Sequence, residues 1–129
     1  MPVTRITLGE QYSDTQLGEI SAILHQSLTD EFAVPLEDCF QIFERLPVSQ
    51  RIFDPHYQSG QRSDNFVLFQ ITAGKPRTIE QKKNFYRTLS QRLFSALGLH
   101  ADDVMVIIQF NTADDWSFSH GEMYCPEAL

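Results

Sequence analysis

The first third of the chain changes from a strand-like to a helix-like pattern of apolar and polar positions. From Val3 to Leu8 the side chains alternate in character with a period of two, which is typical of a strand. Ser13 followed by Gln16 has the spacing of a capping box and predicts a helix start. Pro35 ends the helix, and an apolar stretch from Cys39 to Leu46 predicts a second strand. The helical stripe between them consists of Leu17, Ile20, Leu24, Leu28 and Phe32.

The second half of the chain has the same order of elements. Residues 65–73 predict a strand, and Thr78 with Gln81 forms another capping box. Gly98 is the expected C-cap of the second helix, and the nearly continuous apolar run from Val104 to Phe110 is typical of a buried parallel strand. The expected helical stripe consists of Ile79, Tyr86, Leu89, Leu93 and Leu97.

The two halves are copies of one unit. An ungapped shift of 65 residues aligns identical residues across most of one unit, including Ile6 with Ile71, Gly9 with Gly74, Leu24 with Leu89 and Asp38 with Asp103. Strand, helix and strand in this order form a right-handed βαβ crossover. We therefore predict an α/β (α+β) fold in one domain over residues 1–129. Two pseudo-symmetric βαβ units, about 2–46 and 66–111, form a four-stranded sheet with both helices on one face, and 112–129 is a tail.

One face of this sheet needs a partner. Residues 47–64 and 111–129 are too short and too polar to cover it, so we expect oligomerisation through the bare face. Residues 47–64 are a connecting loop, with a short strand expected near Arg51 to Phe53.

Composition excludes several classes of partner. The 129 residues carry a formal net charge of −7, and 42% of them are hydrophobic, as in a folded domain. An acidic chain repels nucleic acids and anionic membranes. The longest apolar run is far below the ~20 residues of a membrane span, so we expect a cytoplasmic protein. Cys39 and Cys125 have no metal-ligand partners at short spacing, and we predict no metal or other cofactor.

Pro2 directly follows the initiator methionine and opens the first predicted strand. A small second residue generally permits removal of Met1, and Pro2 then carries a free secondary amine. The reference pKa of an α-amine is about 8, and desolvation or nearby cations lower it toward neutrality, where a general base works best. Two interpretations stay open, because proline is also tolerated without any chemical role at the first position of a strand.

A cationic loop lies between the third predicted strand and the second helix. Lys75 and Arg77 flank Pro76 there and could together bind a carboxylate, which Arg77 could grip with two hydrogen bonds. The alternative is a short loop with solvated charges. The equivalent loop of the first unit, Glu10 to Tyr12, is not cationic, so folding of the unit does not require the basic pair.

Two further pairs are candidates for the site. Asp38 and Asp103 are repeat mates before the second and fourth strands, where an aspartate can bond the backbone of a turn, and in an asymmetric site only one of them can also be catalytic. Trp116 and Phe118 follow the last strand and either wall a small apolar pocket or plug the edge of the core.

With these residues in view, the chain resembles the tautomerase superfamily, whose members are built from βαβ units and use an amino-terminal proline. The fuller resemblance is to the malonate semialdehyde decarboxylase branch, in which two fused units form one subunit of a trimer. The matching segments are Pro2, Pro35-Leu36-Glu37-Asp38 leading into Gln41, Lys75-Pro76-Arg77 followed by Gln81-Lys82, and Asp115-Trp116-Ser117-Phe118 with Gly121-Glu122.

The resemblance implies a role for each candidate. Pro2 is the catalytic amine, Asp38 orients or activates water, and Arg77 binds the substrate carboxylate, while the pocket is lined by Trp116 and Phe118. Lys75 departs from the family pattern, which has a second arginine there, and lysine lacks the planar two-pronged grip. The resemblance also implies a homotrimer that acts on small oxo-carboxylic acids, by keto-enol tautomerisation or by decarboxylation or hydration of the malonate semialdehyde type.

A different class of protein shares the predicted order of elements. Ferredoxin-like modules that bind small molecules or proteins also contain strand-helix-strand twice, but have no catalytic terminus. Replacement of Pro2 distinguishes the two hypotheses, because a binding module keeps its activity without this residue.

Overall fold

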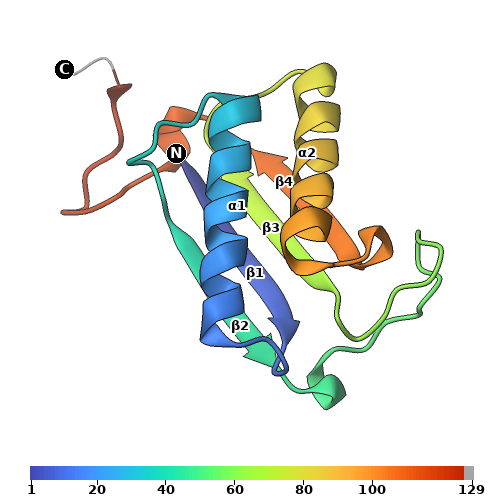
Figure 1. Ribbon diagram of the computed structural model, residues 1–129. Helices are drawn as coiled ribbons and strands as arrows, with labels where there is room; N and C mark the ends of the chain where they lie inside the picture. Colours follow the sequence, from blue (N-terminus) through green and yellow to red (C-terminus); the bar gives the residue numbers. More distant parts are fainter. Residues whose placement is uncertain (127–129) are drawn as a thin grey trace.

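The computed structural model describes residues 1–126 as one mixed sheet covered by two long helices (Figure 1). The strands are arranged in the order β2-β1-β3-β4. β2 is parallel to β1 and β4 is parallel to β3, whereas the central strands β1 and β3 are antiparallel. The elements are β1 (Pro2–Gly9), α1 (Asp14–Phe32), β2 (Gln41–Leu46), η1 (Val48–Gln50), β3 (Val67–Ala73), α2 (Ile79–Leu97), η2 (Ala101–Asp103), β4 (Val104–Phe110) and η3 (Ala113–Asp115).

The internal repeat of the sequence is also a repeat of the structure. Helix α2 begins and ends 65 residues after α1, and the 3₁₀ turn η3 begins and ends 65 residues after η1. Ser13 and Thr78 both form the predicted capping boxes. The residues after the two helices, Ala33 and Gly98, are both left-handed, with φ of 55° and 68°. The predicted fold of two pseudo-symmetric βαβ units is therefore confirmed.

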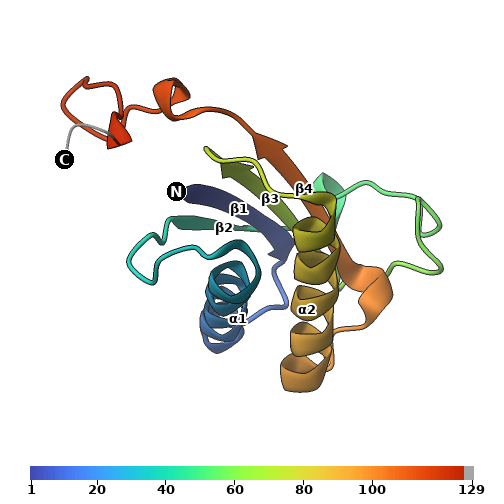
Figure 2. The ribbon, with the colours of Figure 1, turned by 90° about the horizontal axis from the view of Figure 1, so that it is seen from above.

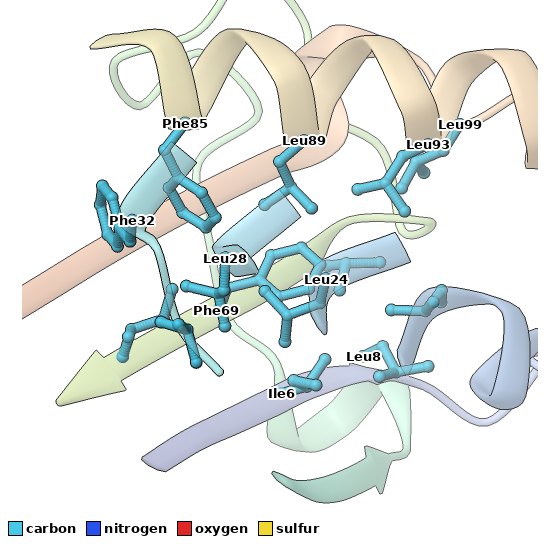
Figure 3. Packing of buried hydrophobic residues seen from close by; sticks show 14 of the residues in the cluster. Ile6, Leu8, Leu24, Leu28, Phe32, Phe69, Phe85, Leu89, Leu93 and Leu99 are labelled. Carbon is cyan, nitrogen blue, oxygen red and sulfur yellow. The ribbon is translucent and has the colours of Figure 1, made fainter. Parts of the chain in front are cut away.

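Both helices lie on the same face of the sheet (Figure 2). Alternate strand positions meet the inner stripes of the helices and form a single buried cluster (Figure 3). Its fully buried members include Ile6, Leu8, Ile20, Leu24, Val67, Phe69, Phe85, Leu89 and Leu93. Among residues 1–126, no helix is long and apolar enough to cross a membrane.

The predicted stripe of α2 is wrong at its beginning. Ile79 and Tyr86 are exposed, with exposed fractions of 70% and 39%, whereas Phe85 is fully buried. The Phe85 ring packs against Phe32 of α1, with 4.8 Å between the ring centroids. Phe85 lies four residues before Leu89 and shares its face, and Tyr86 is turned about 100° away from Phe85. The aromatic residue that packs into the core is therefore Phe85 and not Tyr86.

The opposite face of the sheet carries both apolar and charged side chains. Ile42 of β2 and Ile107 of β4 are 46% and 42% exposed. Arg5 of β1 lies on the same face and forms an ion pair with Glu44 of β2, with 3.0 Å between the charged atoms. The helices cover only the other face of the sheet and leave this one open. Association of copies through the open face stays a prediction.

The loop between the two units is irregular where a short strand was expected. Residues 51–53 follow η1 without strand pairing, because the Arg51 side chain turns inward and organises the loop. Its guanidinium donates hydrogen bonds to the carbonyl oxygens of Leu46 and Asp64, at 3.0 and 2.8 Å. It also lies 5.2 Å from the ring centroid of Phe66. A buried arginine, rather than a strand ladder, therefore satisfies the backbone here.

Truncation of Phe85 tests the corrected core. Phe85→Ala is expected to lower the free energy of unfolding by about 3–5 kcal/mol, because it leaves a cavity between the two helices. Tyr86→Ala is the matched control and is expected to cost less than about 1 kcal/mol, since this ring is partly in solvent. Urea denaturation followed by circular dichroism measures both values, and equal losses would contradict the assignment.

Candidate active site

The topology collects several candidate residues at one end of the sheet. Because β1 is antiparallel to β3, the amino ends of β1 and β2 lie beside the carboxyl ends of β3 and β4. Pro2 begins β1, Asp38 precedes β2, the loop 74–78 follows β3 and residues 111–126 follow β4. Figure 1 shows the amino terminus beside the orange segment that follows β4. One end of the molecule thus holds candidates from both halves of the chain.

The two repeat-related aspartates lie at opposite ends of the sheet. Asp103 is only 4% exposed and accepts hydrogen bonds from the backbone N–H and the hydroxyl of Ser63, at 2.6 and 2.7 Å. Asp38 is half-buried, and its carboxylate pairs with the chain's own terminal ammonium. The same repeat position therefore anchors a loop at one end and faces the amino terminus at the other.

The amino terminus lies against the carboxylate of Asp38. The Met1 ammonium nitrogen is 3.2 Å from Oδ2 of Asp38. Pro2 is buried and stands opposite Ala73 in the antiparallel pairing of β1 with β3. With Met1 attached, the nitrogen of Pro2 is an amide and has no basicity. Loss of Met1 makes Pro2 the terminal amine, one residue from the position that now pairs with Asp38.

A hollow of about 540 Å³ opens on one side of the amino terminus. Glu37 and Asp38 contribute carboxylates to its wall, and the remainder is largely apolar, with four aromatic residues. The rings of Trp116 and Phe118 are stacked, with 5.3 Å between their centroids and 19° between their planes. Tyr124 packs edge-on against Phe118 at 5.2 Å. The wall therefore combines two carboxylates with an apolar, partly aromatic surface.

A second hollow of about 440 Å³ lies on the other side and contains the cationic loop. It is lined by Lys75 and Arg77, together with apolar residues at the end of α1 and beyond. Met1, Pro2 and Tyr124 line both hollows. The amino terminus therefore stands between a partly aromatic space that holds two carboxylates and a space that holds two cations.

The guanidinium of Arg77 is fixed by the backbone around it. It donates hydrogen bonds to the carbonyl oxygen of Phe32, at 2.9 Å, and to that of Lys75. Its central carbon lies 5.2 Å from the ring centroid of Phe32. Burial lowers the pKa of Arg77 from its ordinary value, but arginine stays protonated in proteins. A guanidinium held in this way keeps further N–H donors for an anion, whereas Lys75 is exposed.

The sequence analysis missed two aromatic residues of the site. Tyr124 lines both hollows, and its backbone N–H donates to the carbonyl of Trp116 at 2.8 Å, but its local sequence contains no periodic signal. Phe40 lines the first hollow and is 61% exposed. The predicted strand from Cys39 to Leu46 placed Cys39 and Phe40 inside the sheet. In the structure β2 begins only at Gln41, and Cys39 is exposed. The proximity of Phe40 to Asp38 was the available signal.

Comparison with known proteins agrees with this geometry. "Probable tautomerase YusQ" of Bacillus subtilis (strain 168) is 36% identical over 121 residues, which are 94% of this chain and 95% of that protein. A crystal structure of malonate semialdehyde decarboxylase superposes with a TM-score of 0.85 at 28% identity, covering 93% of this chain and 92% of the other. A fused 4-OT described as a symmetric trimer has a TM-score of 0.76 over 94% of each chain, and its identity of 16% shows the fold alone.

The family itself is shown by the extent of the match. A family model described as "Tautomerase enzyme" matches residues 38–119, from the carboxylate at the amino terminus to the aromatic residues after β4. The relative from Bacillus subtilis extends the similarity over nearly the whole chain. The chain therefore belongs to the tautomerase family.

Proposed function

We propose that this tautomerase-family protein uses the amine of Pro2 as an acid and base on small oxo-carboxylic acids. The observation that carries the proposal is the position of the amino terminus between Asp38 and the hollow of Arg77. A fixed guanidinium suits the carboxylate of the substrate, and a terminal amine suits transfer of a proton at the neighbouring carbon. The similarity to a probable tautomerase supports the same class of reaction.

In the tautomerase reaction, Pro2 acts first as the base. Its neutral amine removes a proton from the carbon beside the ketone of a 2-oxo acid, and the C–H electron pair moves to form the enolate. The resulting ammonium returns the proton at the oxygen to give the enol, and the reverse sequence gives the ketone. Arg77 holds the carboxylate throughout and thereby fixes the reacting carbon relative to the amine. The aromatic wall of Trp116 and Phe118 excludes water from the apolar side.

The decarboxylase reaction uses the other protonation state of the same amine. A protonated Pro2 polarises the carbonyl of a 3-oxo acid, so that the electron pair released with carbon dioxide is stabilised on the carbonyl oxygen. Asp38 prepares a water molecule for the related hydration. The neighbour described as having decarboxylase and hydratase activities supports this branch. Lys75 weakens the case for it, because lysine lacks the planar two-pronged grip of arginine.

The comparisons give no support to the ferredoxin-like binding module, since the matched family is one of tautomerases. We also propose that the protein is a homotrimer. The partly apolar outer face of the sheet and the trimer of the fused 4-OT support this assembly.

The state of the amino terminus is expected to decide activity. Protein that lacks Met1 should turn over small 2-oxo or 3-oxo acids, whereas protein that retains Met1 should be slower by at least about 100-fold, because an amide nitrogen is no acid or base. Intact mass establishes the terminus of each sample, and a spectroscopic assay over a panel of such acids measures the rate. Pro2→Ala, with Pro55→Ala as the control, completes the comparison. Undiminished turnover by protein that retains Met1 and by Pro2→Ala would favour a site that does not use the terminus.

Arg77 is expected to determine affinity for the carboxylate. Arg77→Lys keeps the charge but removes the planar donors, so KM should rise by about tenfold with a smaller change in kcat. Arg87→Lys makes the same substitution on the exposed part of α2 and should match the parent protein. Steady-state kinetics on one oxo acid measure both variants, and equal KM values for the two would remove Arg77 from the proposed site.

The pH dependence is expected to separate the two reactions. Tautomerisation needs the neutral amine, so its rate should increase as the pH passes upward through the pKa of Pro2. Decarboxylation needs the protonated amine, so its rate should decrease over the same pH interval. Rate profiles for both reactions on protein without Met1 provide the test. Two profiles with the same slope would contradict a shared titrating amine.

A further inference from the structure

We propose that Asn111 and Gly74 are positioning residues that hold the indole of Trp116 as the wall beside the amino terminus. The proposal rests on the proposed function, because it assigns to the two residues the shape of that site. Neither residue needs to touch a substrate, since both act through Trp116.

Asn111 connects the indole to the end of the sheet. Its side-chain oxygen Oδ1 accepts a hydrogen bond from Nε1 of Trp116, at 2.6 Å. Its own backbone N–H donates to the carbonyl oxygen of Ala73, at 3.0 Å, and so continues the contact between β3 and β4 by one residue. The acceptor is therefore fixed to the sheet and does not move with the tail. Because an indole has a single polar group, this bond determines which edge of the ring faces the end of the sheet.

Gly74 provides the space that the indole occupies. A Cβ atom at this position would lie 2.8 Å from Nε1 of Trp116 and 3.3 Å from its Cδ1. It would also collide with the terminal methyl of Met1. A side chain at this position would therefore require the indole or the loop backbone to shift. The requirement for glycine is one of space, at the point where the indole passes the loop that carries Lys75 and Arg77.

The remaining contacts of Trp116 fix its backbone and one face of its ring. Its N–H donates to the carbonyl of Ala113, and its carbonyl accepts from Tyr124. The ring stacks on Phe118, which is itself 55% exposed. A stack between two partly exposed rings allows rotation within the plane of contact, but the bond to Asn111 does not. Asn111 and Gly74 therefore set the orientation that the other contacts leave open.

The predicted consequence concerns substrate binding more than the chemical step. An indole in a defined orientation offers the same apolar wall to every bound molecule, whereas a ring that moves must be ordered on binding and lowers affinity. Loss of a positioning residue should therefore weaken binding in the ground and transition states alike.

Trp116 is the only tryptophan of the chain, so its emission reports on this ring alone. Asn111→Leu removes the acceptor at similar size, and quenching of the emission by acrylamide should increase. The apparent Kd for pyruvate, measured by titration of the same emission, should rise about fivefold, as for the loss of one hydrogen bond. Asn111→Asp keeps an acceptor and should show the parent's acrylamide quenching. Asn84→Leu, on α2, is the matched control and should resemble the parent in both measurements.

Gly74→Ala provides a second test that does not alter Asn111. A methyl group at residue 74 would contact both the Met1 side chain and the Trp116 indole, so the test uses protein that lacks Met1, where only the indole remains. Acrylamide quenching should then increase, as is expected for Asn111→Leu. Circular dichroism establishes that each variant is folded.

Parent-like quenching in both Asn111→Leu and Gly74→Ala would overturn the proposal. Increased quenching with an unchanged Kd for pyruvate would overturn the role of the two residues in substrate binding. Asn111 and Gly74 would then only hold the tail at Trp116. If the emission of the parent protein shows no saturable change with pyruvate, the proposed binding of small oxo acids fails for this probe. The acrylamide measurement still decides whether Asn111 and Gly74 hold the ring.

Discussion

The antiparallel pairing of β1 with β3 is the constraint on which the site depends. It sets Pro2 opposite Ala73, so the first residue of one unit meets the end of the corresponding strand of the other. Within a single βαβ unit the strands are parallel, and the start of β1 has only the start of β2 beside it. The cationic loop and the aromatic tail therefore reach the amino terminus only through the joining of two units. The covalent duplication supplies residues that one unit lacks.

The same joining creates an equivalent position at the other end of the sheet, and the chain uses it differently. Arg51 is the repeat mate of Trp116, and Phe66 is the mate of Met1. There the guanidinium lies over the Phe66 ring and bonds the carbonyl of Leu46, which is the mate of Asn111. At one end, Arg51 thus occupies the repeat position with a cation bonded to backbone carbonyls, while at the other end Trp116 occupies it with an indole bonded to a side chain and lining a hollow. The two ends of the sheet therefore carry different chemistry at equivalent repeat positions.

The sequence predicts well what is decided locally. Capping boxes need only residues three apart, and both helix starts follow Ser13 and Thr78 as expected. It predicts less well what depends on packing, as the exchange of Phe85 for Tyr86 in the core shows, because two adjacent aromatics satisfy the same local pattern. The meeting of the Met1 amine with Asp38 has no local signal at all, since 36 residues separate them and only the register of β1 and β2 sets their distance. Resemblance to a family, rather than periodicity, is what predicts that Pro2 and Asp38 belong to one site.

Electrostatics raises a difficulty that the geometry resolves. The chain carries a net charge of −7, yet the proposed substrates are anions. Salt screens exposed charges over about 8 Å at physiological ionic strength, so distant surface carboxylates contribute little inside the hollows. Within that range the second hollow holds Arg77, whose guanidinium is half-buried and lies over an aromatic ring, and Lys75, and a bound oxo acid is proposed to meet both. Partial burial of the Arg77 guanidinium reduces the competition of water and lowers the local dielectric constant, so its attraction for a carboxylate is stronger than in bulk water. Local placement of two positive groups beside the amine can therefore outweigh the net charge of the whole chain.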